Sequence, residues 1–575
     1  MTPIVKHLIR RRNKLLRKNR VEAASALSTR INQLITRSNA TTFERVKRGS
    51  REMWNEVNRL RGTGRSQAVS TDCSVTATNL NQHYGRISTD EHYSAPHLKS
   101  TVVDSTKVIM DVLTTFKLLE TVGGTATGPD GMTAWFLEAA APMLAEPITH
   151  LFNVSILSSY VPPQWKISTI TPVPKVPHPS DVADFRPISV TPILCRLLEK
   201  FIVRRFFYPF LTEPLQNQDF LDQYAFRPTG STTAAIIALT HNLLELLNEN
   251  HYVHLIALDF SKAFDTVSHS YLTEQLARLP IPDCIYNWII AFLDNRKHAT
   301  KFNGLLSAII SICASIVQGS GLGPANFITA ISKLKTVHPS NRLIKYADDT
   351  YLLIPASHSA TISAELDHVT DWAATCNLKL NSKKTFEMVI RRPRGRAGRD
   401  AVPITTPGLT RVSSMVILGV TMNEALSFES HITRICCQAR QSLYALRILV
   451  AHGLSGPMLY DVVRATTVAR MLYAAPAWWG FAGQQEKNRL QSAMRRLTRL
   501  RYLPEDSPSF EHICNTADSR LFSAVLGNPG HVLHGLLPPK KSLPYTLRPR
   551  LHDRIIPQAD NLSRKSFIIR MLYSV

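Results

Sequence analysis

The feature that most constrains the fold is a pair of adjacent carboxylates set between two apolar, strand-like arms. Residues 342–354 read RLIKYADDTYLLI, with Asp348 and Asp349 in the middle. Aromatic, β-branched and leucine residues on both sides predict two paired strands, so that the acidic pair occupies the turn of a hairpin. Adjacent acids are common on protein surfaces, and the pair alone says little. Apolar arms on both sides indicate a core hairpin whose acidic tip points into a cleft.

A third carboxylate lies near the end of another apolar segment. The run HLIALDF (254–260) has the length and composition of a buried strand, and it carries Asp259. A carboxylate is costly there unless it is paired or binds a metal. Strand pairing would bring Asp259 beside Asp348, and such a cluster would repel itself without cations. Hard oxygen ligands suit Mg²⁺, and two Mg²⁺ ions about 3.5–4 Å apart are what in-line nucleotidyl transfer requires.

The charge of the chain points to a polyanionic partner. The formal net charge is +24, and residues 1–66 hold 17 Lys and Arg against four Asp and Glu. So large a positive field favours nucleic acid over a merely solubilising surface. The first group of candidate contacts is Arg10, Arg11 and Arg12, which would serve nuclear localisation or RNA binding. The second group is Arg495 and Arg499, which would contact phosphates from one helical face.

Composition argues against several classes of protein. The apolar runs are shorter than the about 20 residues of a membrane helix, and the N-terminus lacks the apolar stretch of a secretory signal. The eight cysteines form no CxxC pair, which favours reduced thiols over a disulfide framework or a zinc site. The segment HVLH (531–534) has no partner pair and is not expected to bind zinc. We expect a protein of the nucleus or cytoplasm without a membrane partner.

The periodicity of the chain predicts an α+β fold. Basic helices are expected over residues 1–66, ended by Gly62 and Gly64, and further helices over 101–160 around a loop at 123–131. A hairpin-like segment is expected at 166–190. The pattern predicts helices at 232–249, near 362–373 and near 432–446, and an all-helical stretch over about 425–510. Within that stretch, AWWG (477–480) is expected to pack in a core rather than to stack on bases.

Eight motifs occur in an order that resembles the reverse transcriptase of non-LTR (LINE-type) retrotransposons. KYADD (345–349) and LDFSKAFD (258–265) are similar to motifs C and A of that family, and QGSGLGP (318–324) lies between them, where motif B belongs. The other five are GPDG (128–131), PK with DFRPIS (174–175 and 184–189), QYAFRPTGST (223–232), LKLNSKKT (378–385) and ILGVTMNEALSFESHI (417–432). The resemblance covers roughly residues 100–435.

The resemblance implies a right-hand polymerase with fingers, an antiparallel-sheet palm and a thumb, extended by helices at both ends. The expected division is a basic helical linker over 1–100, fingers over 101–250, a palm with part of the fingers over 251–425, a helical thumb over 426–510 and a C-terminal extension over 511–575. The implied activity is RNA-directed DNA synthesis, in which dNTPs are added to a primer 3′-hydroxyl with two Mg²⁺ ions, or Mn²⁺. The implied template is the element's own RNA, and the implied primer is DNA at a target site.

The resemblance also assigns roles to single residues. Asp259, Asp348 and Asp349 match the catalytic aspartates, and Phe260 would offer a backbone carbonyl to one metal ion. Lys384 matches a lysine that donates a proton to pyrophosphate, although a solvated loop lysine is an equally good interpretation.

Further residues match positions around the nucleotide. Lys175 and Arg186 match residues that grip the triphosphate, and Gln318 and Gly319 match the place where the backbone passes close to template and nucleotide. Phe264 stands where reverse transcriptases place a bulky ring that excludes a 2′-hydroxyl. The next residue, Asp265, is expected to cap the following helix.

Several positions depart from the family pattern. Thr125 stands where a lysine is common, Ala225 replaces a glycine, residues 315–317 differ from the usual run before motif B, and Lys333 occupies a position that is often acidic. The family's upstream endonuclease is not recognisable in residues 1–100, so an incomplete reading frame is expected. The alternatives are a group II intron maturase or telomerase-type polymerase, which the motif spacing fits less well, and an inactive nucleic-acid-binding remnant.

Overall fold

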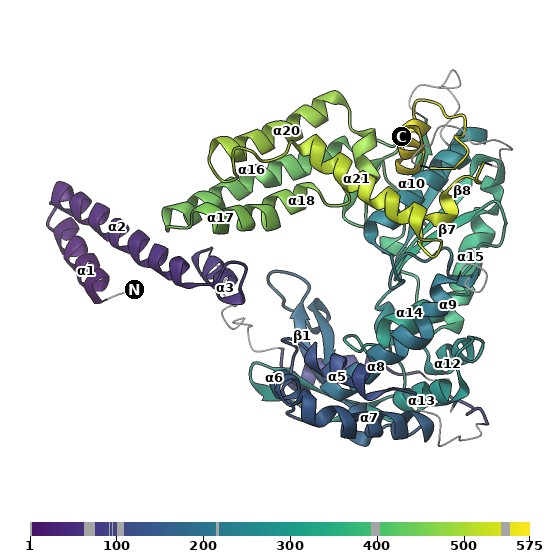
Figure 1. The fold of residues 1–575 in the computed structure, drawn as a ribbon. Helices are drawn as coiled ribbons and strands as arrows, with labels where there is room; N and C mark the ends of the chain where they lie inside the picture. Colours follow the sequence, from purple (N-terminus) through teal and green to yellow (C-terminus); the bar gives the residue numbers. More distant parts are fainter. Residues whose placement is uncertain are drawn as a thin grey trace.

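The computed structural model describes residues 3–61, 75–90, 93–94, 96–100, 109–213, 218–392, 403–541 and 552–574. Helices dominate it, and they surround two five-stranded sheets and one small hairpin (Figure 1). The mixture of helices with mostly antiparallel strands agrees with the α+β prediction. Within the described residues, no helix is both long enough and apolar enough to cross a bilayer.

The first sheet, called here the central sheet, has the strand order β10–β9–β3–β8–β7. Its strands are β3 (Tyr252–Leu258), β7 (Arg342–Tyr346), β8 (Asp349–Pro355), β9 (Phe386–Arg391) and β10 (Thr410–Arg411). β3 pairs antiparallel with β8 and β9, and β7 pairs antiparallel with β8. The predicted antiparallel sheet is therefore present, except that the short β10 runs parallel to β9.

Both faces of the central sheet are buried, because its strands alternate between two hydrophobic cores. Val253 and Leu255 of β3 belong to one core, whereas Ile256 and Leu258 belong to the other. The alternation continues on β8, where Leu353 faces the first core. A strand buried on both faces reads as a continuous apolar run, which explains the composition of residues 254–258.

The first core is built from α10 and the helices that follow residue 428. α10 (Thr232–Glu249) has the predicted bounds and is buried along most of its length. The hydroxyl of Ser231 caps it by accepting from the amide of Ala234 at 3.1 Å. The hairpin of β11 (Ser414–Ile417) and β12 (Val420–Asn423) leads into the helices α16 (Glu429–Ala451), α17 (Gly456–Val463), α18 (Ala469–Met471), α19 (Ala475–Trp478), α20 (Gln484–Arg499), α21 (Phe510–Gly527) and α22 (Phe567–Tyr573).

Helices α16 to α21 form an upper helical layer over the central sheet (Figure 1). The prediction of an all-helical stretch over 425–510 is confirmed. Trp478 and Trp479 are 0% and 3% exposed, so the prediction that AWWG packs in a core is also confirmed.

The second core gathers helices on the other face of the central sheet. They are α5 (Val112–Glu120), α6 (Ala134–Ala139), α7 (Ala141–Leu157), α8 (Ile193–Ile202), α9 (Tyr208–Thr212), α11 (Ala263–Thr266), α12 (His269–Ala277), α13 (Asp283–Leu293), α14 (Gly323–Ala330) and α15 (Ile362–Thr375). The helices expected within 101–160 and near 362–373 are present. Figure 1 shows most of this group below the upper helical layer.

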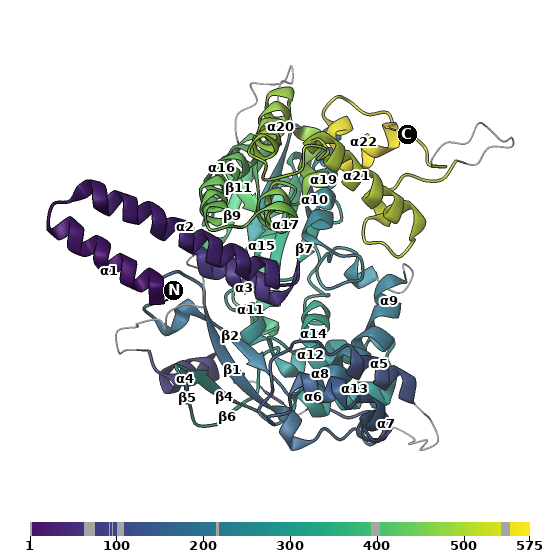
Figure 2. The same cartoon turned by 60° about the vertical axis from the view of Figure 1, so that its left-hand side comes forward.

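The second sheet, called here the lateral sheet, combines segments that are distant in sequence. β1 (Ile167–Pro174) and β2 (Phe185–Val190) form the predicted antiparallel hairpin. β1 also pairs in parallel with β4 (Arg296–Phe302), which pairs with β5 (Leu305–Leu306) and β6 (Ile310–Ile312). α4 (Ala77–Ile87) lies beside β4 to β6 (Figure 2). The pairing of β1 with β4 was not expected from the sequence.

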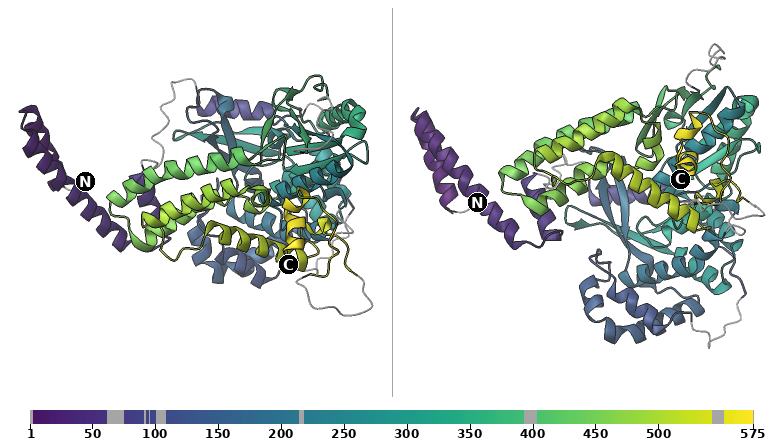
Figure 3. Two further views of the ribbon diagram at one scale, coloured as in Figure 1. Left: turned by 90° about the horizontal axis from the view of Figure 1, so that it is seen from above. Right: turned by 45° about the horizontal axis from the view of Figure 1, so that its top comes forward.

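An N-terminal arm of three helices extends away from the rest of the molecule (Figures 1 and 3). It consists of α1 (Pro3–Arg17), α2 (Val21–Arg45) and α3 (Arg51–Leu60), as the basic N-terminal pattern predicted, whereas Gly62 and Gly64 lie outside the described residues. The arm contacts the turn between α16 and α17. The Thr36 hydroxyl donates to the Ala451 carbonyl at 2.7 Å, and Arg48 pairs with Asp461 at 2.5 Å.

The cysteines in the described ranges are free thiols, as expected, and Cys73 lies outside those ranges. His534 of the HVLH segment contacts the Val525 carbonyl at 2.8 Å. Among the described residues, no three His, Cys, Asp or Glu side chains are already arranged to hold a metal ion.

Candidate active site

The Asp348–Asp349 pair lies at the tip of the hairpin formed by β7 and β8. β7 ends at Tyr346, which pairs with Asp349, so the turn consists of Ala347 and Asp348 alone. Ala347 has a φ of 56°, the positive value that a two-residue hairpin turn requires. Its amide donates to the side-chain oxygen of Gln223 at 3.1 Å. The predicted position of the acidic pair is confirmed, and a side chain from a distant segment supports the turn.

Asp259 follows the last residue of β3 and lies beside this tip. Leu258 pairs with Thr350, so the next residue along β3 reaches the level of Asp349. Asn381 holds Asp259 in two ways: its backbone amide donates to the Asp259 carbonyl at 2.8 Å, and its side-chain amide donates to the carboxylate at 3.1 Å. The motif that contains Asn381 was recognisable from the sequence, but a role for this residue was not predicted.

Phe260 lies between two backbone hydrogen bonds that join its neighbours to the 378–381 segment. Asp259 accepts from Asn381, and the amide of Ser261 donates to the Lys379 carbonyl at 2.9 Å. In such a ladder the carbonyl of the intervening residue points away from the paired segment. The Phe260 ring is buried against Trp372, with ring centroids 5.8 Å apart. The buried ring thus anchors the backbone of Phe260, while the Phe260 carbonyl points away from the 378–381 segment.

The three carboxylates act on one another electrostatically. The pKa of Asp348 is raised, first by burial and then by the charge of Asp259, and the positive charge of Arg186 opposes the shift. The pKa of Asp349 is raised to about 6. Part of the Asp349 side chain is exposed, yet lost hydration is the largest cause, followed by the charges of Asp348 and Asp259. Mutual repulsion of this kind means that the three groups share one region.

This donor set suits a divalent cation. It consists of hard carboxylate oxygens, which Mg²⁺ and Mn²⁺ accept, and their mutual repulsion would be relieved by positive charge. In the described residues the three side chains are not already arranged as the ligands of a closed metal site. The chemistry of the donors therefore fits a metal, and binding would bring the three carboxylates closer together.

Positive groups cluster on the β1–β2 hairpin and just before α11, and the charge of one of them, Arg186, reaches Asp348. Lys175 follows β1, and its ammonium donates to the Ala183 carbonyl at 2.8 Å. The pKa of Lys175 is lowered, first by burial and then mainly by the nearby charge of Lys262, with smaller effects of Arg186 and Lys384. These four cations therefore lie in one neighbourhood. Lys262, which precedes α11, was not among the predicted site residues.

The Gln318–Gly319 loop lies against β2. The amide of Ser189 donates to the Gln318 carbonyl at 2.7 Å. Gly319 has a φ of 115°, and a Cβ atom there would lie 2.3 Å from the Ser189 carbonyl oxygen. Only glycine permits both this backbone conformation and this close approach. The loop is thereby held between the lateral sheet and α14.

Asp265 does not cap a helix, contrary to the sequence prediction. The cap of α12 is Ser268, whose hydroxyl accepts from the Tyr271 amide at 3.3 Å. Asp265 instead lies within the short α11, and its carboxylate accepts from the side-chain amide of Gln318 at 2.9 Å. Burial raises the pKa of Asp265 to about 6, although Lys175 and Lys262 oppose the shift. The register of α11 turns the side chain toward the Gln318 loop.

Phe264 lies between two other aromatic rings. It stacks on Phe327 of α14 at a centroid distance of 4.0 Å and an interplanar angle of 10°. The edge of Phe226 meets it at 6.2 Å. Contacts on two sides restrict the rotamers of the ring and fix its position next to Asp265.

Comparison with known proteins identifies the domain that carries these residues. Residues 173–422 match the family model described as reverse transcriptase (RNA-dependent DNA polymerase). This chain contains a reverse transcriptase domain. All the predicted catalytic, metal and nucleotide residues lie inside it, from Lys175 to Lys384, whereas Arg10–Arg12, Arg495 and Arg499 lie outside.

The relatives of this reverse transcriptase domain are polymerases of retrotransposons. The chain is 26% identical over 382 residues to the probable RNA-directed DNA polymerase from transposon BS of Drosophila melanogaster, covering 61% of this chain and 40% of the relative. It is 25% identical over 356 residues to the RNA-directed DNA polymerase from mobile element jockey of the same species, covering 59% and 38%. The Pol polyprotein of the type-1 element R2 of Popillia japonica is 23% identical, with 56% and 46% covered.

These matches make the domain a distant homologue of non-LTR retrotransposon polymerases, as the motifs predicted. The chain spans about two fifths of the length of the first of these relatives. Among solved structures, apo telomerase from Candida tropicalis is similar with a TM-score of 0.36 and 13% identity, covering 67% of this chain and 68% of that one.

The remaining predicted residues are Lys384, inside the reverse transcriptase domain, and the arginines outside it. Lys384 is exposed, and its backbone amide donates to the Asn381 carbonyl at 3.0 Å, which places it one turn after the residue that holds Asp259. Arg495 and Arg499 are exposed on α20 of the upper helical layer. Arg10 and Arg11 are exposed on α1, and Arg12 is half-buried beside Asn13. Helix α1, which carries these three arginines, lies on the opposite side of the molecule from β7 and β8 (Figure 1).

Proposed function

We propose that the chain is an RNA-directed DNA polymerase that adds dNTPs to a primer 3′-hydroxyl on an RNA template. The observation that carries this proposal is the meeting of Asp259 with Asp348 and Asp349 at adjacent strand ends, inside a reverse transcriptase domain. In this proposal the central sheet is the palm of a right-hand polymerase. The lateral sheet with its neighbouring helices serves as the fingers, and the upper helical layer serves as the thumb.

The metal ligands in this proposal are the carboxylates of Asp259, Asp348 and Asp349 and the carbonyl of Phe260. Two Mg²⁺ ions, or Mn²⁺, would make the primer hydroxyl a better nucleophile and neutralise charge on the triphosphate. The chain itself supplies position. Asn381 holds Asp259 through two hydrogen bonds, and Gln223 holds the hairpin turn. Catalysis of this type relies on positioning and electrostatics and needs little covalent chemistry from side chains.

In this proposal a cluster of cationic side chains binds the triphosphate. Lys175, Arg186 and Lys262 lie close enough for their charges to affect one another or the carboxylates. A tetra-anionic nucleotide relieves this repulsion, and the guanidinium of Arg186 can grip phosphate oxygens in a bidentate way. Lys384 belongs to the same neighbourhood and is the group that we assign to protonate the departing pyrophosphate.

Phe264 favours DNA over RNA synthesis in this proposal. Its ring is held by Phe327 and Phe226 and cannot easily turn aside. A fixed ring beside the sugar of the incoming nucleotide would clash with a 2′-hydroxyl but accept a deoxyribose.

The proposed partners are an RNA template, the element's own transcript, and a DNA primer at a target site. Arg495 and Arg499 on α20 and the arginines of α1 are the proposed phosphate contacts outside the reverse transcriptase domain. These partners place the activity in the nucleus, the cytoplasm or both.

The proposal is tested by primer extension on poly(rA)/oligo(dT) with Mg²⁺, offering dTTP or rUTP. We expect dTTP incorporation by the wild type, and loss of it in the Asp348→Asn, Asp349→Asn double variant. The matched control is Asp367→Asn with Asp371→Asn, two exposed acids of α15 whose removal leaves incorporation unchanged. Incorporation of rUTP as fast as dTTP would overturn the role of Phe264. A folded wild type that binds the duplex without extending it would show a nucleic-acid-binding remnant instead.

A further inference from the structure

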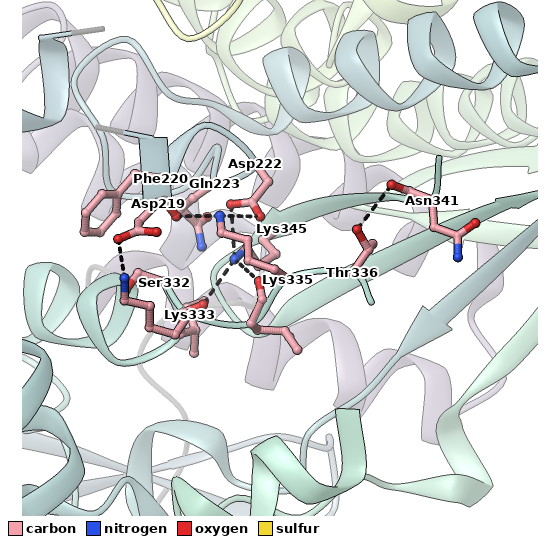
Figure 4. A network of polar contacts seen from close by, with 12 residues as sticks. Asp219, Phe220, Asp222, Gln223, Ser332, Lys333, Lys335, Thr336, Asn341 and Lys345 are labelled. Atoms are coloured by element: carbon pink, nitrogen blue, oxygen red, sulfur yellow. Dashed lines mark hydrogen bonds and ion pairs between the residues drawn. The ribbon is translucent and has the colours of Figure 1, made fainter. Parts of the chain in front are cut away.

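A fully buried lysine lies within the hairpin that carries the acidic pair. Lys345 is in β7, three residues before Asp348, and it is 0% exposed. Lysine is rarely buried to this extent unless its ammonium is paired. Figure 4 shows its side chain at the centre of a polar network that also includes Asp222 and Lys335.

The ammonium of Lys345 binds the end of α14. It donates to the carbonyls of Ile331 at 3.1 Å and Leu334 at 3.0 Å, which follow the last residue of that helix. The C-terminal end of a helix carries partial negative charge, so a cation is favourable there. Because α14 begins directly after the Gln318–Gly319 loop, Lys345 connects the acidic hairpin to the helix that leads from this loop.

The same ammonium pairs with a second segment, residues 219–226. Its nitrogen lies 3.1 Å from a carboxylate oxygen of Asp222. The backbone adds two hydrogen bonds, because the Lys345 amide donates to the Asp222 carbonyl at 2.7 Å and its carbonyl accepts from Tyr224 at 2.8 Å. Segment 222–224 therefore runs along β7 as an additional short strand, parallel to it.

Segment 219–226 reaches both the metal-binding turn and the aromatic ring at the nucleotide. Gln223 accepts from the amide of Ala347, in the turn itself. Three residues later, the Phe226 ring packs on Phe264. One segment thus touches the carboxylate hairpin and the sugar-selecting ring, and Lys345 is the fully buried side chain among those that join this segment to the end of α14.

The outer part of the network is more exposed. Lys335 donates to the Asp222 carboxylate at 3.0 Å and to the Asp219 carbonyl at 2.8 Å, and Lys333 donates to the Asp219 carboxylate at 2.7 Å. Position 333 is often acidic in the family. Here it is a lysine, and its partner Asp219 is the acidic residue. The side chains of Lys333 and Asp219 are 38% and 44% exposed, so this pair contributes little to stability.

The buried position of Lys345 is costly. Burial lowers the pKa of Lys345 to about 8, and Asp222 opposes the shift. A buried ion pair seldom stabilises a fold more than apolar side chains of the same volume would. What the lysine provides is geometry, since two carbonyl acceptors from one segment and the paired carboxylate of another converge on one nitrogen.

We propose that Lys345 is a positioning residue for the metal ligands Asp348 and Asp349. Its ammonium holds the hairpin that carries them in register with the Gln318 loop and with segment 219–226. This inference rests on the proposed polymerase function. Loss of the ammonium loosens the turn that carries Asp348 and Asp349, so metal affinity falls while the residues that contact the nucleotide remain in place. Residues that support metal ligands in this way typically change metal affinity about 10–100-fold.

The test compares Lys345→Met with the matched control Lys333→Met, which removes an ammonium from the outer network alone. Mn²⁺ binding is measured by electron paramagnetic resonance without nucleic acid, and the Mg²⁺ dependence of dTTP incorporation is measured on poly(rA)/oligo(dT). We expect Lys345→Met to weaken Mn²⁺ binding about tenfold and to raise the Mg²⁺ midpoint equally. At saturating Mg²⁺ its KM for dTTP should stay within about twofold of wild type. Lys333→Met should match the wild type in all three measurements.

Asp222→Asn serves as a second variant in case Lys345→Met does not fold. It retains the two carbonyl acceptors of Lys345 and should weaken Mn²⁺ binding by about threefold, a smaller effect because the ion pairs of Asp222 with Lys345 and Lys335 are weakened while the ammonium of Lys345 stays in place. A folded Lys345→Met or Asp222→Asn protein that binds Mn²⁺ as the wild type does would overturn the inference while the polymerase function stands. A wild type that neither binds Mn²⁺ nor extends the primer would instead overturn the proposed function, and the inference with it.

Discussion

At the scale of single residues, Asp265 shows how a small change of register alters a role. One position earlier in the chain, Phe264 stacks on Phe327, and Asp265 turns to the side-chain amide of Gln318. The carboxylate thereby fixes which end of that amide faces away from it. Asp265 is therefore a positioning residue for Gln318 in the proposed polymerase.

We expect Asp265→Leu to raise the KM for dNTP at least about tenfold, because a hydrogen bond to a charged group contributes about 1.5–3 kcal/mol. Asp265→Asn retains a carbonyl oxygen that can accept from Gln318 and should stay within about threefold of wild type. Single-nucleotide primer extension over a range of dNTP concentrations measures both values. Equal KM values for the two variants would show that Gln318 is oriented by other contacts.

At the scale of elements, the Gln318–Gly319 loop packs directly on β2 of the lateral sheet. Gly319→Ala would place a Cβ atom 2.3 Å from the Ser189 carbonyl oxygen in a backbone conformation that alanine avoids. We expect a stability loss of about 1–3 kcal/mol and a fall in incorporation of about a hundredfold, since the loop must move. Thermal unfolding and primer extension measure the two effects.

The control for Gly319→Ala is Gly527→Ala, at the end of α21. A Cβ atom there meets no neighbour within 4 Å, so stability and incorporation should equal those of the wild type. A Gly319→Ala protein that extends primers normally would mean that β2 can shift without affecting the site.

The central sheet also contains a buried carboxylate whose pairing predicts a pH dependence. Glu387 of β9 is 0% exposed. Burial alone would raise its pKa, but hydrogen bonds from His254, Thr406 and Arg411 lower the pKa to about 2. A lowered pKa stabilises the fold above the unfolded-state value, near 4.5, and this stabilisation is lost as the pH falls from there toward 2.

We expect Glu387→Gln to lower the free energy of unfolding by about 2–4 kcal/mol at pH 7. The difference from the wild type should shrink below about pH 4.5. Urea unfolding at a series of pH values measures it, with the exposed Glu505→Gln as the control. A difference that stays constant down to the lowest pH at which both proteins fold would contradict the assigned pairing.

At the scale of the whole molecule, the exposed arginines that we propose as phosphate contacts lie on helices outside the central sheet. The arm carries Arg10 and Arg11, and α20 carries Arg495 and Arg499, all exposed. The arm is attached to the upper helical layer through Thr36 and the Arg48–Asp461 pair. The arm and the upper helical layer are therefore connected to one another (Figure 3).

If Arg495 and Arg499 contact phosphates, Arg495→Gln with Arg499→Gln should weaken binding to an RNA–DNA duplex without changing sequence preference. The slope of log affinity against log salt concentration should fall by about 1.8, because each lost phosphate contact releases about 0.9 fewer counterions. Fluorescence anisotropy over a series of salt concentrations measures the slope. The control is Arg278→Gln, directly after α12, where the arginine pairs with Glu274 of that helix. An unchanged slope would place the nucleic acid elsewhere on the molecule.

The features of this protein that depend on local patterns could be predicted from its sequence. Strand-like sequence patterns predicted β3, β7 and β8, and helical periodicity predicted α10 with its observed bounds. The end of β3 then located Asp259, and the turn between β7 and β8 located Asp348 and Asp349. These features need only neighbouring residues, because a strand or helix is recognisable from its own few turns or pleats.

Which distant segments meet was evident only from the folded chain. The parallel pairing of β4 with β1, the hold of Asn381 on Asp259, the contact of Asp265 with Gln318 and the burial of Lys345 all join residues far apart in the chain. Such contacts depend on how the elements pack around the two cores. The sequence pattern of one segment does not show which distant segment it will contact. For this reason the sequence located the carboxylates, whereas the residues that hold them in place were found only through the tertiary contacts.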